Sequence, residues 1–192
     1  MIISQIIGGL GNQMFQYAVG RTLALRHNVP LRLDISAFNC YGLHQGFELQ
    51  RVFASPTEVA TGKEVHDILG WQSSANIQRI LKRLNWPFLC RQGLIVEPQF
   101  NYWSEINSAP CDSYLIGHWQ SEKYFLDNAR IIRSDFSFRS PLDIPNRDLA
   151  LTIGQANAVS LHIRRGDYEK NPKTNAIHGV CPIEYYQSAV KY

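Results

Sequence analysis

The strongest constraint on the fold lies at the start of the chain, where a strand, a glycine-rich turn, a helix and a second strand follow one another. Met1–Ile7 is rich in isoleucine and predicts a β-strand, and Gly8–Gly11 predicts a tight turn. Asn12–His27 has no proline and carries apolar residues at helical spacing, which predicts a helix. Leu31–Ile35 predicts the second strand. Because a strand–helix–strand unit joins parallel neighbours, the sequence predicts an α/β fold with a Rossmann-like parallel sheet covered by helices.

The composition is that of a folded domain and argues against a disordered, membrane-spanning or nucleic-acid-binding chain. Of the 192 residues, 45% are apolar, and the net charge is only +3. No apolar run reaches the roughly eighteen residues of a spanning helix, and the N-terminus lacks the pattern of a secretory signal. The four cysteines are scattered without metal-binding spacing, which predicts reduced thiols and a cytoplasmic location.

Further elements follow along the first 140 residues. Ser55-Pro56-Thr57-Glu58 has the pattern of a capping box, so we expect a helix to begin there. Leu94–Val96 and Tyr114–Ile116 predict strands, and Ser121–Ile132 predicts a helix. Residues 1–140 are therefore expected to form an N-terminal Rossmann-like domain.

The rest of the chain predicts the beginning of a second domain. Leu142–Arg147 is flanked and interrupted by prolines and suits a linker, followed by a helix over Asp148–Gln155. Ala158–Ile163 predicts a buried strand, and a helix begins at Ile183 and still runs at the last residue. Few residues follow Ile163, fewer than the roughly fifty that a domain needs. We therefore expect a linker and helix over 141–156 and an incomplete second domain over 157–192.

The glycine turn has the chemistry of a loop that binds phosphate or sugar. Glycines let the backbone approach a ligand closely, and the first N–H groups of the following helix favour an anion or a hydroxyl. Asp34 ends the next strand about twenty residues on, as in dinucleotide-binding folds, although Met14 stands where a third glycine would be. A nucleotide-binding loop and a plain structural turn both fit this pattern. The candidate ligand-binding residues are Gly9, Gly11, Asn12 and Gln13.

A second polar cluster follows the predicted strand at Ala158–Ile163 and contains two adjacent arginines. In parallel sheets, ligands bind beyond the carboxyl ends of the strands. Arg164 and Arg165 are costly there unless they meet anions, and a guanidinium grips phosphate oxygens with two parallel hydrogen bonds. Asp167 can hold one guanidinium in place, and His162 can hydrogen-bond nearby. The cluster predicts a phosphate site, with a surface ion-pair turn as the structural alternative.

Four segments in this order carry a family resemblance: GGLGNQMFQYA (8–18), GHWQSEKYF (117–125), HIRRGDY (162–168) and HGVCPIEYY (178–186). Together they resemble the bacterial α-1,2-fucosyltransferases of glycosyltransferase family 11, and the resemblance runs along the whole chain. The HxRRxD pattern is also similar to that of α-1,6- and protein O-fucosyltransferases. The resemblance implies a GT-B-like fold of two Rossmann-like domains, GDP-fucose as donor, inversion at the sugar and no metal or other cofactor.

The resemblance also implies roles for the candidate residues. Arg164 first, and Arg165 second, are expected to act as catalytic residues that stabilise the β-phosphate of the departing GDP. His162 and Asp167 are expected in the donor site, and the glycine turn is expected to close the cleft from the other domain. No acidic metal-binding pair stands out, so fixed cations are expected to replace a metal ion.

The acceptor side is less defined by the sequence. Asp34, His44 and Trp119 are candidates there, since aromatic rings suit the apolar faces of sugars, but a structural role fits each of them as well. No general base for the acceptor hydroxyl can be identified.

The predicted function is that of a galactoside α-1,2-L-fucosyltransferase, which transfers fucose from GDP-fucose to a galactose hydroxyl of a glycan. Similar family members continue past Tyr192, so we expect the 192 residues alone to lack turnover. Two alternatives stay open: an NAD-dependent oxidoreductase, suggested by the glycine turn and Asp34, and a non-catalytic fragment that binds nucleotide or glycan.

A basic stretch raises the question of membrane contact. Residues 79–91 contain four basic residues and no acidic one, and a basic amphipathic helix is predicted over Ala75–Leu84. Either this is a solvated face, or it lies peripherally on the inner face of an anionic membrane, where lipid-linked acceptors reside.

Overall fold

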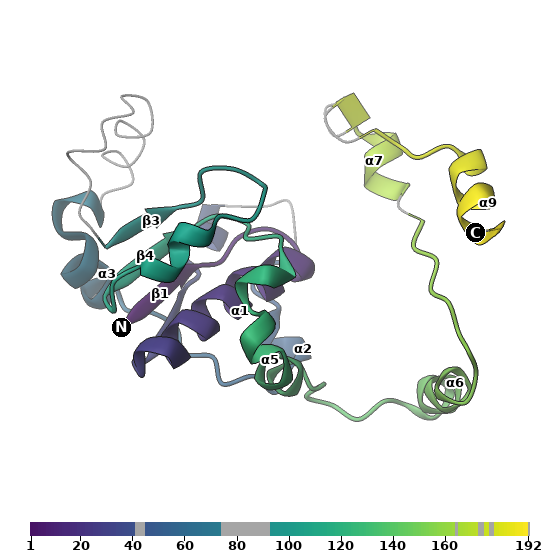
Figure 1. Ribbon diagram of the computed structural model, residues 1–192, viewed down its shortest axis with the longest axis horizontal. Helices are drawn as coiled ribbons and strands as arrows, with labels where there is room; N and C mark the ends of the chain where they lie inside the picture. The colour runs from purple at the N-terminus through teal and green to yellow at the C-terminus, as the bar shows by residue number, and fades with distance from the viewer. Residues whose placement is uncertain (41–44, 74–92, 164, 173–174, 177–178, 192) are drawn as a thin grey trace. The chain divides into compact units, whose positions relative to one another are not determined.

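The computed structural model describes residues 1–40, 45–73, 93–163, 165–172, 175–176 and 179–191 (Figure 1). They belong to two compact units, Met1–Pro141 and Leu142–Tyr192, and each unit is described by itself. Within these residues, no helix combines the length and the apolar character needed to cross a membrane.

The first unit is built on a four-stranded parallel sheet in the order β2-β1-β4-β3. The strands are β1 (Ile2–Gln5), β2 (Leu31–Asp34), β3 (Leu94–Val96) and β4 (Ser113–Ile116). Ile2 of the central strand β1 lies opposite Leu31 on one side and Ser113 on the other. All four strands predicted in this part of the sequence are present, and the predicted α/β fold with a parallel sheet is confirmed.

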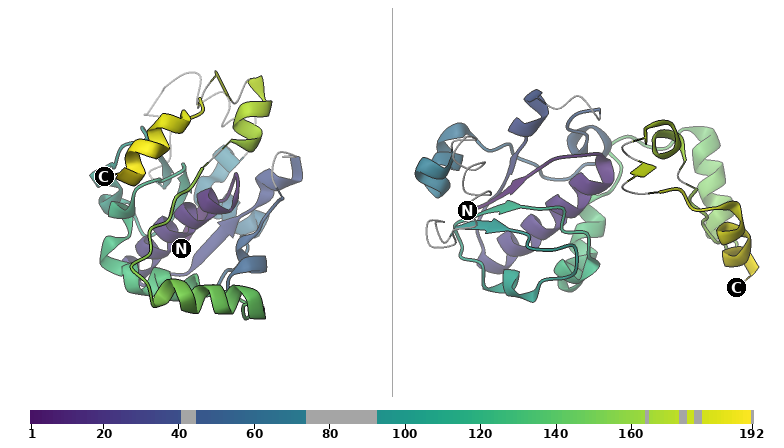
Figure 2. Two further views of the ribbon diagram at one scale, coloured as in Figure 1. Left: turned by 90° about the vertical axis from the view of Figure 1, so that its right-hand side faces the viewer. Right: turned by 90° about the horizontal axis from the view of Figure 1, so that it is seen from above.

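Helices cover both faces of this sheet (Figures 1 and 2). Ile2 packs with Val19 and Leu23 of α1 (Leu10–His27), while the next residue, Ile3, packs with Leu69 of α3 (Gly62–Leu69). Successive side chains of a strand point to opposite faces, so α1 and α3 lie on opposite sides of the sheet. Strands buried on both faces read as continuous apolar runs, which is why they were readable in the sequence.

The order of the strands creates a preferred ligand position. From β1 the chain passes through α1 to β2 on one side, whereas β4, on the other side of β1, comes much later in the sequence. The loops after β1 and β4 therefore start from adjacent strands and lead in different directions. In open parallel sheets, ligands bind at this kind of switch point, beyond the carboxyl ends of the two strands.

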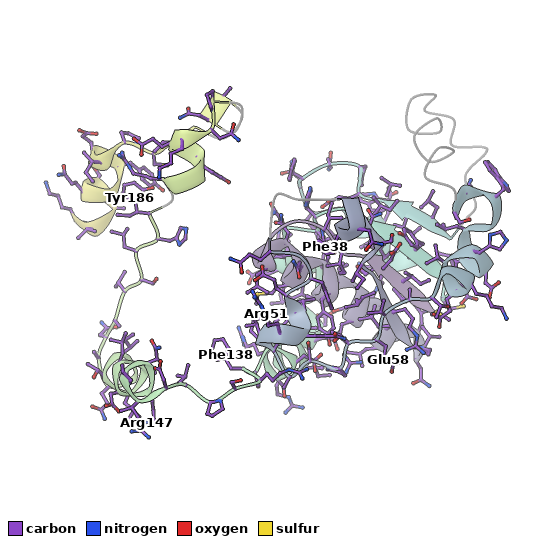
Figure 3. All side chains as sticks on the ribbon, turned by 180° about the vertical axis from the view of Figure 1, so that it is seen from behind. Phe38, Arg51, Glu58, Phe138, Arg147 and Tyr186 are labelled. Carbon is purple, nitrogen blue, oxygen red and sulfur yellow. The ribbon has the colours of Figure 1, made fainter. Side chains whose placement is uncertain are left out.

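The predicted helix start at Ser55-Pro56-Thr57-Glu58 is wrong, and the structure shows why. Leu33 of β2 donates a backbone hydrogen bond to Glu58 and accepts one from Ala60, so this segment runs along the edge of the sheet. Glu58 also forms an ion pair with Arg32 (Figure 3). The helix α3 begins only after this pairing ends, and a true capping box joins Thr61 and Glu64.

The remaining elements of the first unit are short. They are η1 (Ser36–Cys40), α2 (Leu49–Val52), η2 (Gly70–Ser73), η4 (Ser104–Ser108), η5 (Glu122–Tyr124), η6 (Leu126–Asn128) and α5 (Ala129–Asp135). The single helix predicted over Ser121–Ile132 is thus divided into two 3₁₀ turns and a helix that extends to Asp135. Tyr17 and Arg21 of α1 hydrogen-bond to Asp135 at 2.8 and 3.0 Å, which fastens α5 to α1.

The second unit contains α6 (Ile144–Gly154), α7 (Gly166–Lys170) and α9 (Ile183–Lys191). The expected linker over Leu142–Arg147 is wrong in part, because α6 begins at Ile144 with Asp143 as its N-cap. Pro145 lies in the first turn of α6, where a proline needs no hydrogen-bond partner. The predicted helix at Ile183 is confirmed.

The strand predicted over Ala158–Ile163 is not present in this structure. The segment has no strand pairing and is drawn without an arrow in Figure 2, and Val159 is 93% exposed. A strand needs a neighbour for its backbone hydrogen bonds, and no described residue pairs with this segment. Its apolar side chains therefore face solvent.

Candidate functional site

The glycine turn lies at the switch point, between β1 and the start of α1. Gly8 adopts a φ of +79°, and a Cβ atom on it would lie 2.6 Å from the Asn12 amide nitrogen. The positive φ favours glycine at this position, and a larger residue would also displace the Asn12 side chain. Gly9 is the N-cap residue of α1, and Gly11 has no atom within 4 Å of the place where a Cβ would be. The open space beside Gly11 is compatible with close approach of a ligand.

Gln13, which the sequence suggested as a donor ligand, is used inside the protein. Its side chain is fully buried, and its amide nitrogen donates to the carbonyls of Gly8 and Gly46, both at 2.9 Å. Its amide oxygen accepts from the backbone N–H of Glu48 at 2.9 Å. Both donors and the oxygen are thus used by backbone groups. Gln13 holds the glycine turn in place and has no surface with which to contact a ligand.

Gln16 performs a similar task and was missed in the sequence. Its amide oxygen accepts from the N–H of Ile7 at 2.9 Å, and its amide nitrogen donates to the carbonyl of Gly117 at 3.0 Å. It therefore ties the loop after β1 to the loop after β4. The available signal was the spacing: Gln13 and Gln16 are three residues apart, so both lie on the same side of α1.

The turn after β4, Gly117–Gln120, is fixed by a carboxylate. Glu97, directly after β3, accepts hydrogen bonds from the backbone N–H groups of His118 at 2.7 Å and Trp119 at 3.0 and 3.1 Å. A Cβ on Gly117 would lie 2.5 Å from the Cβ of Glu97, so only glycine fits there. We name the segment 117–120 the β4 turn.

The β4 turn contacts the first turn of α1, which directly follows the glycine turn. The Gln120 amide donates to the Asn12 side-chain oxygen at 2.7 Å, across 108 positions of sequence. The first two segments of the family resemblance, GGLGNQMFQYA and GHWQSEKYF, thus meet at the switch point. The structure brings together Gly9, Gly11, Asn12 and Gln120 there.

The structure gives Asp34 and Trp119 internal roles. Asp34 is 8% exposed and accepts hydrogen bonds from the Tyr114 hydroxyl and the Ser36 N–H. Burial raises the pKa of Tyr114, and the Asp34 carboxylate raises it further. Trp119 has no exposed surface and packs edge-on against Tyr124 at 5.5 Å. For both residues, these contacts favour a structural role over a role in binding the acceptor.

The arginine cluster belongs to the second unit and is described in part. Arg164 and the side chain of Asp167 lie outside the described residues, as do His44 and the basic stretch 79–91. Arg165 and His162 are exposed. Among the described residues of this unit, Tyr186 has a buried side chain (Figure 3). Burial raises the pKa of its hydroxyl, the Cys181 thiol raises it further, and the Arg165 guanidinium lowers it.

Metal ligands are not gathered anywhere in the part of the chain that the structure describes. No group of three or more His, Cys, Asp or Glu side chains there is placed to hold an ion. The expectation of a reaction without metal stays a prediction.

These features define an α/β domain of Rossmann-like class with a preorganised pair of turns at its switch point. Comparison with known proteins then gives the family. The model of glycosyl transferase family 11 matches residues 96–192. The chain belongs to glycosyl transferase family 11, which excludes the alternative of an NAD-dependent oxidoreductase.

Two curated relatives align along nearly the whole chain. An alpha-1,2-colitosyltransferase of Escherichia coli is 34% identical over 195 aligned residues, which cover 100% of this chain and 63% of the relative. The O-antigen biosynthesis glycosyltransferase WbnK of Escherichia coli is 31% identical and covered to 67%, with 98% of this chain aligned. The chain thus spans about two thirds of the length of these relatives. No solved structure matches.

Proposed function

We propose that this protein is the N-terminal part of a glycosyltransferase that forms an α-1,2 linkage, with fucose from GDP-fucose as the transferred sugar and a galactoside glycan as the acceptor. The observation that carries the proposal is the contact between the start of α1 and the β4 turn at the switch point, since both contain residues of the family resemblance. Support for the linkage comes from the relative named alpha-1,2-colitosyltransferase.

In this proposal the two units are parts of a GT-B-like fold. Residues 1–140 form the acceptor-side domain, and residues 157–192 begin the domain that binds GDP-fucose. The exposed apolar segment Ala158–Ile163 supports this assignment, because its composition is that of a strand buried on both faces. Neighbouring strands of a complete donor domain would supply the missing hydrogen bonds.

The reaction is an inverting displacement. The acceptor hydroxyl oxygen forms a bond to the anomeric carbon, the bond between that carbon and the phosphate oxygen breaks, and GDP leaves with the electron pair. The hydroxyl proton passes to a base that the described residues do not identify. Arg164 and Arg165 stabilise the charge that develops on the β-phosphate.

Because fixed arginines carry that charge, we expect transfer to continue in excess chelator. The test is the rate of GDP release by the complete protein, measured with EDTA and then with added manganese or magnesium. Loss of activity with EDTA and its recovery with either ion would contradict the metal-free reaction.

A second sugar donor is tested beside GDP-fucose, because one relative is named for colitose. Colitose is fucose without its 3-hydroxyl group, so the two donors differ at one position. The complete protein is incubated with lactose and either GDP-fucose or GDP-colitose, and the product is analysed by mass spectrometry and linkage analysis. A fucosylated product with an α-1,2 linkage supports the proposal. Transfer of colitose alone would assign the other donor, and transfer of neither would refute both.

A matched pair of variants tests the donor site. Arg165→Lys keeps the charge but removes the planar fork, so we expect a loss of most transfer. Arg147→Lys makes the same change at an exposed position of α6, where Arg147 pairs only weakly with Asp148 (Figure 3), and should leave transfer unchanged. Equal activity of both variants would remove Arg165 from the site.

The reaction is proposed to occur in the cytoplasm, where GDP-sugars are made. Peripheral contact of the basic stretch 79–91 with the inner face of the membrane is the accompanying proposal, since lipid-linked acceptors reside there. Sedimentation of the protein with anionic but not neutral vesicles would support it.

A further inference from the structure

The β4 turn holds one residue in a strained backbone conformation. Trp119 has a φ of +55°, and Asn28, at the end of α1, is the other non-glycine residue with a positive φ in the described part of the chain. Asparagine tolerates this conformation, but a bulky tryptophan adopts it rarely. Strain of this kind is kept where the surroundings fix it and is common at functional sites.

Three side chains outside this turn hold it in place. Glu97 binds two of its N–H groups, Gln16 binds the Gly117 carbonyl, and Asn12 binds the Gln120 side chain. The contacts come from Glu97, directly after β3, and from Gln16 and Asn12 of α1. A turn held in this way presents the residue at its tip, His118, in one fixed orientation.

His118 forms an aromatic pair with Phe100. The two rings are parallel within 2°, with centroids 6.2 Å apart. Phe100 is 70% exposed, and His118 is half-buried. The Nδ1 atom of His118 is buried and has no hydrogen-bond partner among the described residues, which leaves Nε2 as the ring nitrogen that can meet a ligand.

We propose that Phe100 and His118 form the subsite that binds a pyranose ring of the acceptor saccharide. The C–H groups on one face of the sugar would lie on Phe100, and a sugar hydroxyl would hydrogen-bond to Nε2 of His118. The pair lies beyond the carboxyl ends of β3 and β4, next to the switch point. The proposal rests on the proposed function, which places the donor diphosphate on the arginines of the other unit and leaves this ring pair to the acceptor.

Steady-state kinetics of the complete protein distinguish an effect on acceptor binding from an effect on donor binding. We expect Phe100→Ala to raise KM for lactose about tenfold and to leave KM for GDP-fucose unchanged. Phe100→Tyr, which keeps an aromatic ring, should have the wild-type KM for lactose. The control is Phe138→Ala, which removes another exposed phenylalanine of the same unit, 62% exposed and stacked on Phe53 (Figure 3). An unchanged KM for lactose in Phe100→Ala would refute the subsite, and a raised KM for GDP-fucose alone would assign the ring pair to the nucleobase instead.

A binding measurement keeps this test separate from the proposed reaction. Saturation-transfer NMR with lactose requires no turnover, and we expect a signal from the galactose ring with wild-type protein that is lost in Phe100→Ala. If this result is obtained from a protein that transfers no fucose, the subsite stands and the proposed reaction is wrong. If wild-type protein gives no signal from lactose, or Phe100→Ala keeps it, the subsite is wrong.

Discussion

Replacement of Gln13 by leucine tests whether this buried side chain holds the glycine turn. Leucine has a similar volume, so the packing around position 13 changes little, but three backbone groups lose their partners: the carbonyls of Gly8 and Gly46 and the N–H of Glu48. A buried polar group without a partner costs about 1–3 kcal/mol, and two of these three bonds are only partly buried. We therefore take about 1 kcal/mol for each and expect the free energy of unfolding to fall by about 3 kcal/mol.

Urea unfolding followed by tryptophan fluorescence measures this change in the first structural unit, which contains Gln13. All four tryptophans lie within residues 1–141, so the signal reports the first unit alone. The corresponding thermal midpoint should fall by roughly 10 °C, given about 2–4 °C per kcal/mol for a domain of this size.

The matched control is Gln120→Leu, which removes an exposed amide with one hydrogen bond, to Asn12. Its effect should stay within about 0.5 kcal/mol, since surface substitutions rarely exceed that value. If the Gln13→Leu variant unfolds at the same urea concentration as Gln120→Leu, the three hydrogen bonds do not hold the turn, and the reasoning is refuted.

Three further predictions concern single residues. The raised pKa of Tyr114 means that the folded protein keeps the phenol proton to a higher pH than the unfolded chain does. The free energy of unfolding should therefore fall as the pH rises above about 10, and it should fall less steeply in Tyr114→Phe. Urea midpoints measured at about pH 8 and pH 11 would show this difference. Gly117→Ala should lower the free energy of unfolding by about 1–3 kcal/mol, because the added methyl group overlaps Glu97; an unchanged urea midpoint would contradict this. Arg164→Lys should abolish most transfer by the complete protein, since lysine lacks the bidentate fork, and near-normal turnover would reject Arg164 as the phosphate ligand.

The strands of the first unit could be predicted because burial on both faces leaves a simple pattern of apolar runs. The start of α3 could not, because two capping patterns compete in the sequence. Ser55 to Glu58 and Thr61 to Glu64 both fit, and the choice is made by backbone pairing of Glu58 and Ala60 with Leu33. That pairing joins segments about 25 positions apart, which no local pattern records.

The sequence predicted the position of the glycine turn better than the contacts of its side chains. The sequence placed the glycine turn correctly, but it assigned Gln13 to a ligand because an amide suits a sugar or a phosphate equally well as a backbone group. The role of Glu97 in holding the β4 turn was missed, since a single carboxylate after a strand carries no spacing signal. That role follows from the adjacency of β3 and β4, which is a property of the sheet.

The central position of β1 has a consequence for synthesis on the ribosome. β1 pairs with β2 soon after both are made, but its other edge waits for β4, whose residues Ser113–Ile116 come about eighty positions later. At about 5–20 residues per second, an apolar strand edge stays open for several seconds on each nascent chain. We expect a ribosome-associated chaperone that binds nascent apolar segments to raise the yield of this protein. Translation pauses placed before residue 113 should lower the yield.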